Sequence, residues 1–157
     1  MRRRNVFAGA MTAMAGMVMV SGLAFGQQPG DMDAAKAASK AFYAALNTSA
    51  EAMHKVYAKT SYVVYVAPGS KAPVVGFDDV KKAIEASWAA TTRRAVSISD
   101  QRIEVRGTLA WENGTKTGTV YLKDGAERKI DTIVTNIYEK IDGQWLMVSH
   151  HAQLKPQ

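Results

Sequence analysis

Residues 129–153, KIDTIVTNIYEKIDGQWLMVSHHAQ, decide the fold that we expect for this chain. Two runs rich in β-branched and aromatic residues flank the segment 140–144, which is the pattern of a β-hairpin. The turn falls on Asp142-Gly143, because this pair adopts the positive φ angles that a tight hairpin turn requires. In the second arm both faces are largely apolar at first, so the pattern predicts a central strand that is covered on two sides.

The second arm of this hairpin determines which histidine faces the interior. Side chains alternate between the two faces of a strand, so the odd-numbered residues from Trp145 to Gln153 share one face. On this count His151 lies on the face of Trp145, and His150 lies on the opposite face. The two imidazoles are therefore not expected to form a common metal site.

The first 26 residues have the pattern of a secretory signal peptide. Three arginines at positions 2–4 precede an uncharged stretch, Val6 to Val20, and Ala24-Phe25-Gly26 fits a small-x-small cleavage site. A membrane anchor is the alternative, but Gly, Ala, Ser and Thr make the stretch weak for a spanning helix. We predict cleavage near Gly26 and a periplasmic or secreted protein with no membrane attachment after cleavage. Residues 3–7 also resemble a twin-arginine signal, so the export route stays open.

Charge and composition exclude several classes of function. The full chain has 20 Lys and Arg against 14 Asp and Glu, but three arginines belong to the predicted signal, so the mature charge is +3 rather than +6. This modest charge does not indicate a nucleic-acid-binding protein. The chain has no cysteine, so disulfides and thiolate chemistry are excluded.

The chain after the signal divides into a flexible leader, 27–33, and one folded domain, 34–155. Asp31 or Asp33 is the expected N-cap of the first helix. Asn113-Gly114 and Asp124-Gly125 are both expected to be hairpin turns. The predicted helices cover 34–46, 50–57 and 80–91, and the predicted strands cover 62–66, 73–76, 97–106, 108–112, 115–123 and the two arms of the final hairpin.

Helices first and long antiparallel strands afterwards indicate an α+β fold. Three N-terminal helices are expected to pack on a strongly curved antiparallel sheet, and the concave side of such a sheet forms a cone. Side chains or a ligand must fill this cone. Arg93-Arg94 and Lys81-Lys82 are expected at the two ends of the third helix, where they are interpreted as solvated surface.

Several segments resemble the nuclear transport factor 2-like superfamily. These are 42–47 (FYAALN), 63–69 (VVYVAPG) and 75–78 (VGFD) before a helix. Ala110-Trp111, Thr135 and the ending 142–151 (DGQWLMVSHH) resemble its SnoaL-like branch, and the resemblance covers 34–153. It implies the cone fold and, as is usual in the superfamily, a homodimer through the sheet. It implies no particular activity, because this fold hosts isomerases, cyclases, dehydratases and non-catalytic domains.

The resemblance does not support ketosteroid isomerase chemistry. Such enzymes use a tyrosine and a protonated aspartic acid against an enolate, with a second carboxylate that moves the proton. Tyr43 matches the tyrosine, but Thr135 or Asn136 stands at the aspartic acid's place. No acid lies near Val66-Ala67, where the proton-shuttling carboxylate would be.

The SnoaL-like ending points to His151 as the candidate catalytic residue, a general acid or base with Asp131 as a candidate partner. The alternative is a structural histidine at the bottom of the cone. Tyr65 and Trp88 are the expected pocket walls, and Thr135 and Asn136 are polar residues in an otherwise apolar strand that require partners. The predicted ligand-binding set is Tyr43, Tyr65, Trp88, Thr135, Asn136 and His151.

Three functions remain open at this point. The favoured one is an exported domain that binds a small, largely apolar molecule in its cone. The others are a lyase- or isomerase-type enzyme that uses His151, and a dimerisation or scaffold module with a filled cone. We predict no metal and no cofactor, because the chain lacks the ligand spacing of a zinc site and any phosphate-binding glycine loop. Leu146 and Val148, with Val120 and Leu122, are the expected dimer surface.

Overall fold

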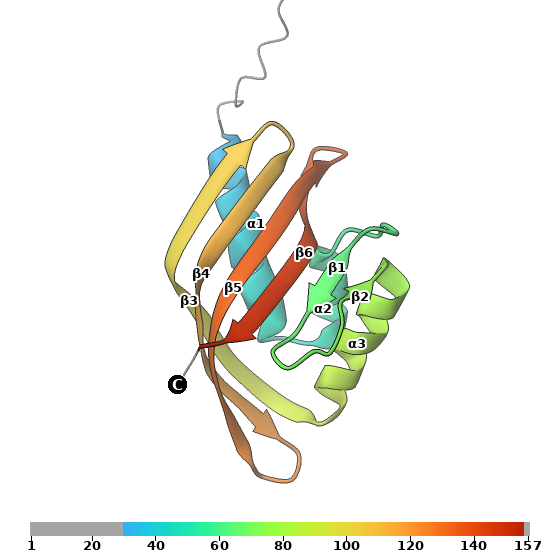
Figure 1. Cartoon of the computed structure of the whole chain (residues 1–157), viewed down its shortest axis with the longest axis vertical. Coiled ribbons are helices and arrows are strands. Elements are labelled where there is room, and N and C mark those ends of the chain that lie inside the picture. Colours follow the sequence, from blue (N-terminus) through green and yellow to red (C-terminus); the bar gives the residue numbers. More distant parts are fainter. Residues whose placement is uncertain (1–29, 156–157) are drawn as a thin grey trace, which may run out of the picture.

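Three helices and six strands make up residues 30–155, the range that the computed structural model describes. In chain order they are α1 (Asp31–Leu46), α2 (Ala50–Val56), β1 (Val64–Val66), β2 (Val74–Val75), α3 (Phe77–Ala89), β3 (Thr91–Arg106), β4 (Leu109–Leu122), β5 (Glu127–Ile141) and β6 (Gln144–Leu154) (Figure 1). The predicted signal peptide, 1–26, lies outside the described residues. Within 30–155, no helix has the length and apolarity needed to cross a bilayer.

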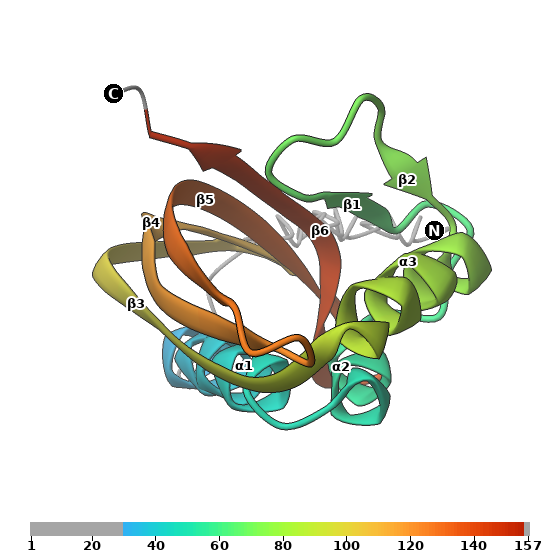
Figure 2. The same ribbon diagram turned by 90° about the horizontal axis from the view of Figure 1, so that it is seen from below.

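The strands form one sheet in the order β2-β1-β6-β5-β4-β3. Neighbouring strands are antiparallel except β1 and β6, which pair in parallel. The sheet curls strongly, with α1 and α2 along one side and α3 next to β1 and β2 (Figure 2). The predicted α+β fold, three helices on a strongly curved and mostly antiparallel sheet, is confirmed.

The final hairpin has the predicted turn. Asp142 and Gly143 both have positive φ angles, 49° and 80°, and connect β5 directly to β6. Asp124-Gly125 likewise lies between β4 and β5. Both arms of the hairpin are central strands of the sheet, because β4 pairs with β5 and β1 pairs with β6.

The predicted turn at Asn113-Gly114 is wrong, because β4 runs straight through it. The chain reverses earlier, at Gly107, and β3 and β4 then pair along almost their full length. Gly114 lies within β4 and allows close packing of β3 against β4, and it does not form a turn. A Cβ atom there would lie 2.9 Å from the Ser99 carbonyl oxygen, so the backbone of β3 leaves little space for a larger residue.

Both long helices begin earlier than predicted. The N-cap of α1 is Gly30, so residues 31–33 of the predicted leader form the first helical turn. Asp31, expected as a cap, is buried and forms an ion pair with Lys140 at 2.7 Å. The third helix ends at Ala89 and β3 begins at Thr91, so Arg93 and Arg94 lie on a strand and not on a helix end.

The core fills the closed end of the curved sheet. The ring of Phe42 makes edge contacts with Tyr43 at 5.1 Å and Tyr57 at 6.1 Å between centroids. These rings, together with Met147 and Val63, are almost fully buried. Phe42 also lines the cavity described below, so the core packs directly against one wall of it.

Candidate functional site

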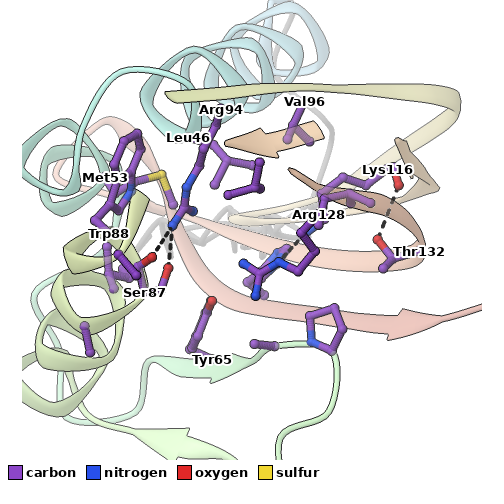
Figure 3. A pocket seen from close by; sticks show the side chains of 18 of the residues that line it. Leu46, Met53, Tyr65, Ser87, Trp88, Arg94, Val96, Lys116, Arg128 and Thr132 are labelled. Carbon is purple, nitrogen blue, oxygen red and sulfur yellow. Dashed lines mark hydrogen bonds between the residues drawn. The ribbon is translucent and has the colours of Figure 1, made fainter. Parts of the chain in front are cut away.

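A cavity of about 530 Å³ opens between the helices and the concave side of the sheet. This volume lies in the range of small-molecule sites in proteins. Every helix and every long strand contributes to it (Figure 3). The lining residues are Phe42, Leu46, Met53, Tyr65, Ala67, Pro68, Ile84, Ala86, Ser87, Trp88, Ala90, Arg94, Val96, Lys116, Val120, Leu122, Arg128, Lys129, Ile130, Thr132, His150 and Leu154.

Most of this lining is apolar, but its charged groups are all cations. Arg94, Lys116 and Arg128 point into the cavity from three strands (Figure 3), and Lys129 also belongs to its lining. No Asp or Glu occurs among the described residues that line it. The cavity therefore combines an apolar body with positive charge.

Arg94 is held against the cavity wall by α3. Its guanidinium donates hydrogen bonds to the Ser87 carbonyl oxygen at 2.9 Å and to Ser87 Oγ at 2.6 Å. The same group lies over the Trp88 ring, 4.3 Å from its centroid, in a cation–π contact. Its Nε atom is buried with no hydrogen-bond partner among the described residues.

Lys116 and His150 form the polar floor of the cavity. Both are buried, with 7% and 3% of their surface exposed, and Lys116 Nζ lies 3.3 Å from His150 Nε2. The imidazole stacks on the Tyr65 ring with centroids 5.6 Å apart. It also contacts Phe42 at 5.3 Å between centroids, so two rings fix its orientation.

Behind this floor lies a buried carboxylate, Glu112, which is 0% exposed. It accepts hydrogen bonds from Ser39 Oγ at 2.7 Å, Asn136 Nδ2 at 2.8 Å and Tyr138 Oη at 2.8 Å, and also from Gln101 Nε2. No cation is among these partners. Neutral donors therefore compensate for the desolvation of this charge.

The carboxylate fixes the direction of every hydrogen bond from Glu112 to the cavity. Asn136 donates from Nδ2 to Glu112 Oε2, so its amide presents the NH₂ group to Glu112 and its Oδ1 to His150. His150 must then donate from Nδ1, at 2.6 Å, which leaves Nε2 to accept from Lys116. A continuous chain Glu112–Asn136–His150–Lys116 thus connects the buried charge to the cavity.

Burial and neighbouring charge shift the pKa values along this chain. Burial, and then the nearby Arg94, lowers the pKa of Lys116 from 10.5 to about 8. Burial, and then Lys116, lowers the pKa of His150 well below 6.5. His150 is therefore a neutral ring near pH 7, as its hydrogen bonds require.

Glu112 also affects its two tyrosine neighbours. Burial, followed by the negative charge of Glu112, raises the pKa of Tyr43 and that of Tyr138. Both phenols stay protonated at neutral pH. They act as hydrogen-bonding groups of a buried network and do not reach the cavity lining.

The prediction that His151 faces the cone is wrong; His150 does. The cause is a β-bulge in β6. Tyr138 pairs with Met147 while the adjacent Ile137 pairs with Ser149, so Val148 is an extra residue without a partner. The extra residue shifts the alternation of faces by one position. His151 is consequently exposed on the outer face, opposite Thr135.

The other predicted site residues separate into three groups. Tyr65 and Trp88 lie in the cavity lining. Tyr43 and Asn136 lie in the buried network, with Asn136 Nδ2 3.3 Å from Tyr43 Oη. Thr135 lies on the outer face of the sheet and accepts a hydrogen bond from Asn113 at 2.9 Å, so the structure does not bring it to the cavity.

The cavity cations Arg94, Lys116 and Arg128 were not predicted as site residues, and neither were Glu112 and His150. Strand alternation from Ala110 places Glu112 and Lys116 on the same inward face as Val120. The mistaken turn at Asn113-Gly114 hid this signal by dividing the strand. No group of three or more side chains suited to a metal is found in residues 30–155.

The family model of the SnoaL-like domain matches residues 35–153. The chain belongs to the SnoaL-like domain family. The match runs from within α1, at Ala35, almost to the end of β6, at Gln153. No curated protein matches this SnoaL-like domain.

Solved structures of the nuclear transport factor 2-like fold superimpose closely on this SnoaL-like domain. A proposed dehydratase of that family from Streptomyces avermitilis has 20% identity and a TM-score of 0.72, over 81% of this chain and 98% of that one. A proposed aromatic ring hydroxylase from Novosphingobium aromaticivorans has 16% identity and a TM-score of 0.72, over 83% and 94%. A proposed calcium/calmodulin-dependent protein kinase type II association domain from Thiobacillus denitrificans has 24% identity and a TM-score of 0.67, over 77% and 94%. Identities this low establish the shared fold alone.

Proposed function

We propose that this SnoaL-like domain binds a small, largely apolar molecule in its cone. The observation that carries the proposal is the cavity of about 530 Å³ beneath α3, whose walls are mainly aliphatic and aromatic. Trp88 and Tyr65 supply the large walls, and Lys116 and His150 supply polar contacts at the floor. The residues for binding are therefore Tyr65, Trp88, Lys116 and His150, and not His151.

A cavity-filling variant tests this proposal. Ala67 lines the cavity next to β1, so Ala67→Trp places an indole where the ligand would lie. In a thermal-shift screen of small apolar molecules, hits on the wild type should bind Ala67→Trp at least tenfold more weakly by calorimetry. Ala37→Trp is the matched control, because Ala37 is exposed on α1 and does not line the cavity. Equal binding to both variants would contradict the proposal.

A second candidate function is proton-transfer catalysis of the lyase or isomerase type. The observation that favours it is the hydrogen-bonded chain from Glu112 to Lys116, which ends at the cavity. The proposed dehydratase of the same fold is consistent with such chemistry. His151 is on the wrong face for the general acid or base, and the amine of Lys116 is the group in the right position. Turnover that survives in Lys116→Met would exclude this role.

The scaffold alternative requires a filled cone, and the cavity argues against that part of it. An assembly role through the outer face of the sheet is compatible with ligand binding in the cone. The proposed kinase association domain shares this fold, and the outer face here exposes Trp111 and Ile133. We therefore propose a homodimer through that face.

We also propose that the protein is exported, with cleavage near Gly26. The support is the basic, apolar and small-residue pattern of residues 1–26. Intact mass of the protein purified from the periplasm or medium should correspond to a chain that begins near Gln27. Recovery of only full-length protein in the cytoplasmic fraction would refute export.

A further inference from the structure

Three of the four cations that line the cavity have no acidic partner among residues 30–155. Lys116 has His150, a neutral ring, as its hydrogen-bonding partner, and none of the ion pairs among the described residues includes Lys116, Arg94 or Arg128. Lys129 differs from them, because it pairs with Glu127 at 3.2 Å. Of the three unpaired cations, Lys116 is buried, Arg94 is half-buried and Arg128 is exposed. A buried cation such as Lys116 is normally paired, because desolvation of a lone charge is costly.

The three unpaired cations also lie close enough to repel one another. Burial is the main cause of the lowered pKa of Lys116, and the charge of Arg94 lowers it further. Burial is likewise the main cause of the lowered pKa of Arg94, and the charge of Arg128 adds to it. Figure 3 shows the Arg94 and Arg128 side chains extending into the same space, with Tyr65 directed toward it from β1. Repulsion among like charges in one cavity is relieved when an anion enters it.

The rest of the cavity sets the shape of that anion. Beyond the cationic groups the lining is formed by Leu46, Met53, Trp88, Val96 and neighbouring apolar residues from the helices and strands. A fully polar anion such as inorganic phosphate would leave these walls in contact with water. An apolar body with one acidic group satisfies both parts of the lining.

Resting on the binding function proposed above, we infer that the ligand of this cavity is an amphipathic monocarboxylate, with its carboxylate at Arg94, Lys116 and Arg128 and its apolar body against Trp88 and the aliphatic wall. The carboxylate accepts charge-assisted hydrogen bonds from the ammonium and guanidinium groups. Tyr65, protonated at neutral pH, offers a further donor. Neutral molecules of the same shape leave the three cations uncompensated and bind more weakly.

Matched pairs of acid and amide test this inference. Calorimetry at pH 7.4 compares 2-naphthoate with 2-naphthamide and decanoate with decanamide, so the aromatic and the aliphatic body are tested separately. In at least one pair the carboxylate should bind at least tenfold more tightly than its amide, as expected for charge-assisted contacts that replace neutral ones. The pair that shows the larger preference for the acid indicates whether the apolar part of the ligand is aromatic or aliphatic.

Variants that remove one positive charge show which cations cause the preference for the carboxylate over the amide. Lys116→Met and Arg128→Met should each reduce the ratio of acid to amide affinity at least threefold, and Arg128 is exposed enough that its loss leaves the fold intact. Lys129→Met is the matched control, since Lys129 is already paired, and it should keep the wild-type ratio. Circular dichroism of each variant confirms that it is folded.

The outcomes separate this inference from the function on which it rests. If amides bind as tightly as acids and Ala67→Trp weakens both, the anion preference is wrong and the apolar binding function stands. If no member of either pair binds and the apolar screen gives no hit, both are wrong. A preference that persists in Lys116→Met and Arg128→Met would also overturn the inference, because these cations would not be its source.

Discussion

At the scale of single residues, Glu112 is the most constrained group in the molecule. Its carboxylate accepts from a hydroxyl, two amides and a phenol, and it has no contact with solvent. All of these partners act as donors, so the site requires a group that only accepts. The sequence shows an acid in a strand, but only the fold reveals that the acid is enclosed.

We expect Glu112→Gln to reduce the free energy of unfolding by about 2–3 kcal/mol, because the new NH₂ group would face groups that are already donors. Urea denaturation measures the loss. Glu104→Gln is the control: Glu104 is exposed and pairs with Arg106 at 3.6 Å, so its replacement should change stability by less than about 0.5 kcal/mol. A loss of less than about 0.5 kcal/mol for Glu112→Gln as well would show that Glu112 is not an obligate acceptor.

Lys116 should make stability depend on pH in a defined window. Its pKa is about 8 in the fold against an ordinary 10.5, so between these values the unfolded chain binds more protons. Stability therefore rises with pH in that window, and below pH 8 the folded state carries the full cost of the buried charge. Lys116→Met should be more stable than the wild type at pH 7, by up to about 3 kcal/mol, and the difference should shrink toward pH 10.

Urea denaturation of both proteins at pH 7 and pH 10 measures this difference. Comparison with Lys116→Met removes the contribution of tyrosines, which titrate in both proteins. Lys129→Met should show no such pH dependence, because Lys129 lies mostly in solvent. A stability difference that grows from pH 7 to pH 10 would contradict the sign of the shift.

At the scale of elements, close contact between β3 and β4 depends on glycine. Gly118 has a φ of 145°, and a Cβ atom there would lie 2.1 Å from the Ala95 carbonyl oxygen. Backbone cannot move away as a flexible side chain can, so neither the angle nor the space admits another residue. These contacts place Arg94 and Lys116, from the two strands, in one cavity.

Gly118→Ala should therefore reduce the free energy of unfolding by about 3 kcal/mol or more, from the clash and the unfavourable φ together. Gly125→Ala is the matched control. Gly125 also has a positive φ, 87°, but no atom lies within 4 Å of its added Cβ, so only backbone strain of about 1 kcal/mol applies. Equal losses in the two variants, measured by urea denaturation, would show that the strand contact can relax.

Local patterns predicted the elements well where the signal was local. The Asp142-Gly143 turn and the Ala-rich first helix follow from backbone preferences, and both are present. Asn113-Gly114 carries the same local turn signal, but pairing of β4 with strands on both sides overrides it. The bulge at Val148 depends on the register of β5 against β6, which strand alternation alone does not contain. The fold was thus predictable, while the face of each histidine was not.

At the scale of the whole molecule, the outer face of the sheet is the surface through which we propose self-association. The expected dimer residues Val120 and Leu122 line the cavity instead, and Val148 is buried. Trp111 and Ile133, 38% and 42% exposed, replace them on neighbouring strands β4 and β5. Ile133 pairs with Thr115, four residues along β4 from Trp111, so the two side chains mark separate points of the same outer face. Large apolar side chains exposed on one sheet face are candidates for an interface.

We expect the mature protein to be a dimer in light scattering at micromolar concentration, and Trp111→Glu to be a monomer. The charge would be buried without a partner at the interface, which raises the dissociation constant at least a hundredfold. Ala37 is exposed on the solvent side of α1, so Ala37→Glu should leave the dimer unchanged. A monomeric wild type would contradict this surface.

The extra residue in β6 affects how the counterpart of His150 is found in related sequences. Trp145 and His150 both point inward although they are five positions apart, an odd distance that regular alternation forbids. A relative without the insertion would carry the counterpart of His150 four positions after its tryptophan. A sequence motif with a fixed spacing between tryptophan and histidine would therefore miss that counterpart, or would match a histidine on the outer face. Odd intervals between enclosed side chains are therefore a practical marker of where such chains gained or lost a residue.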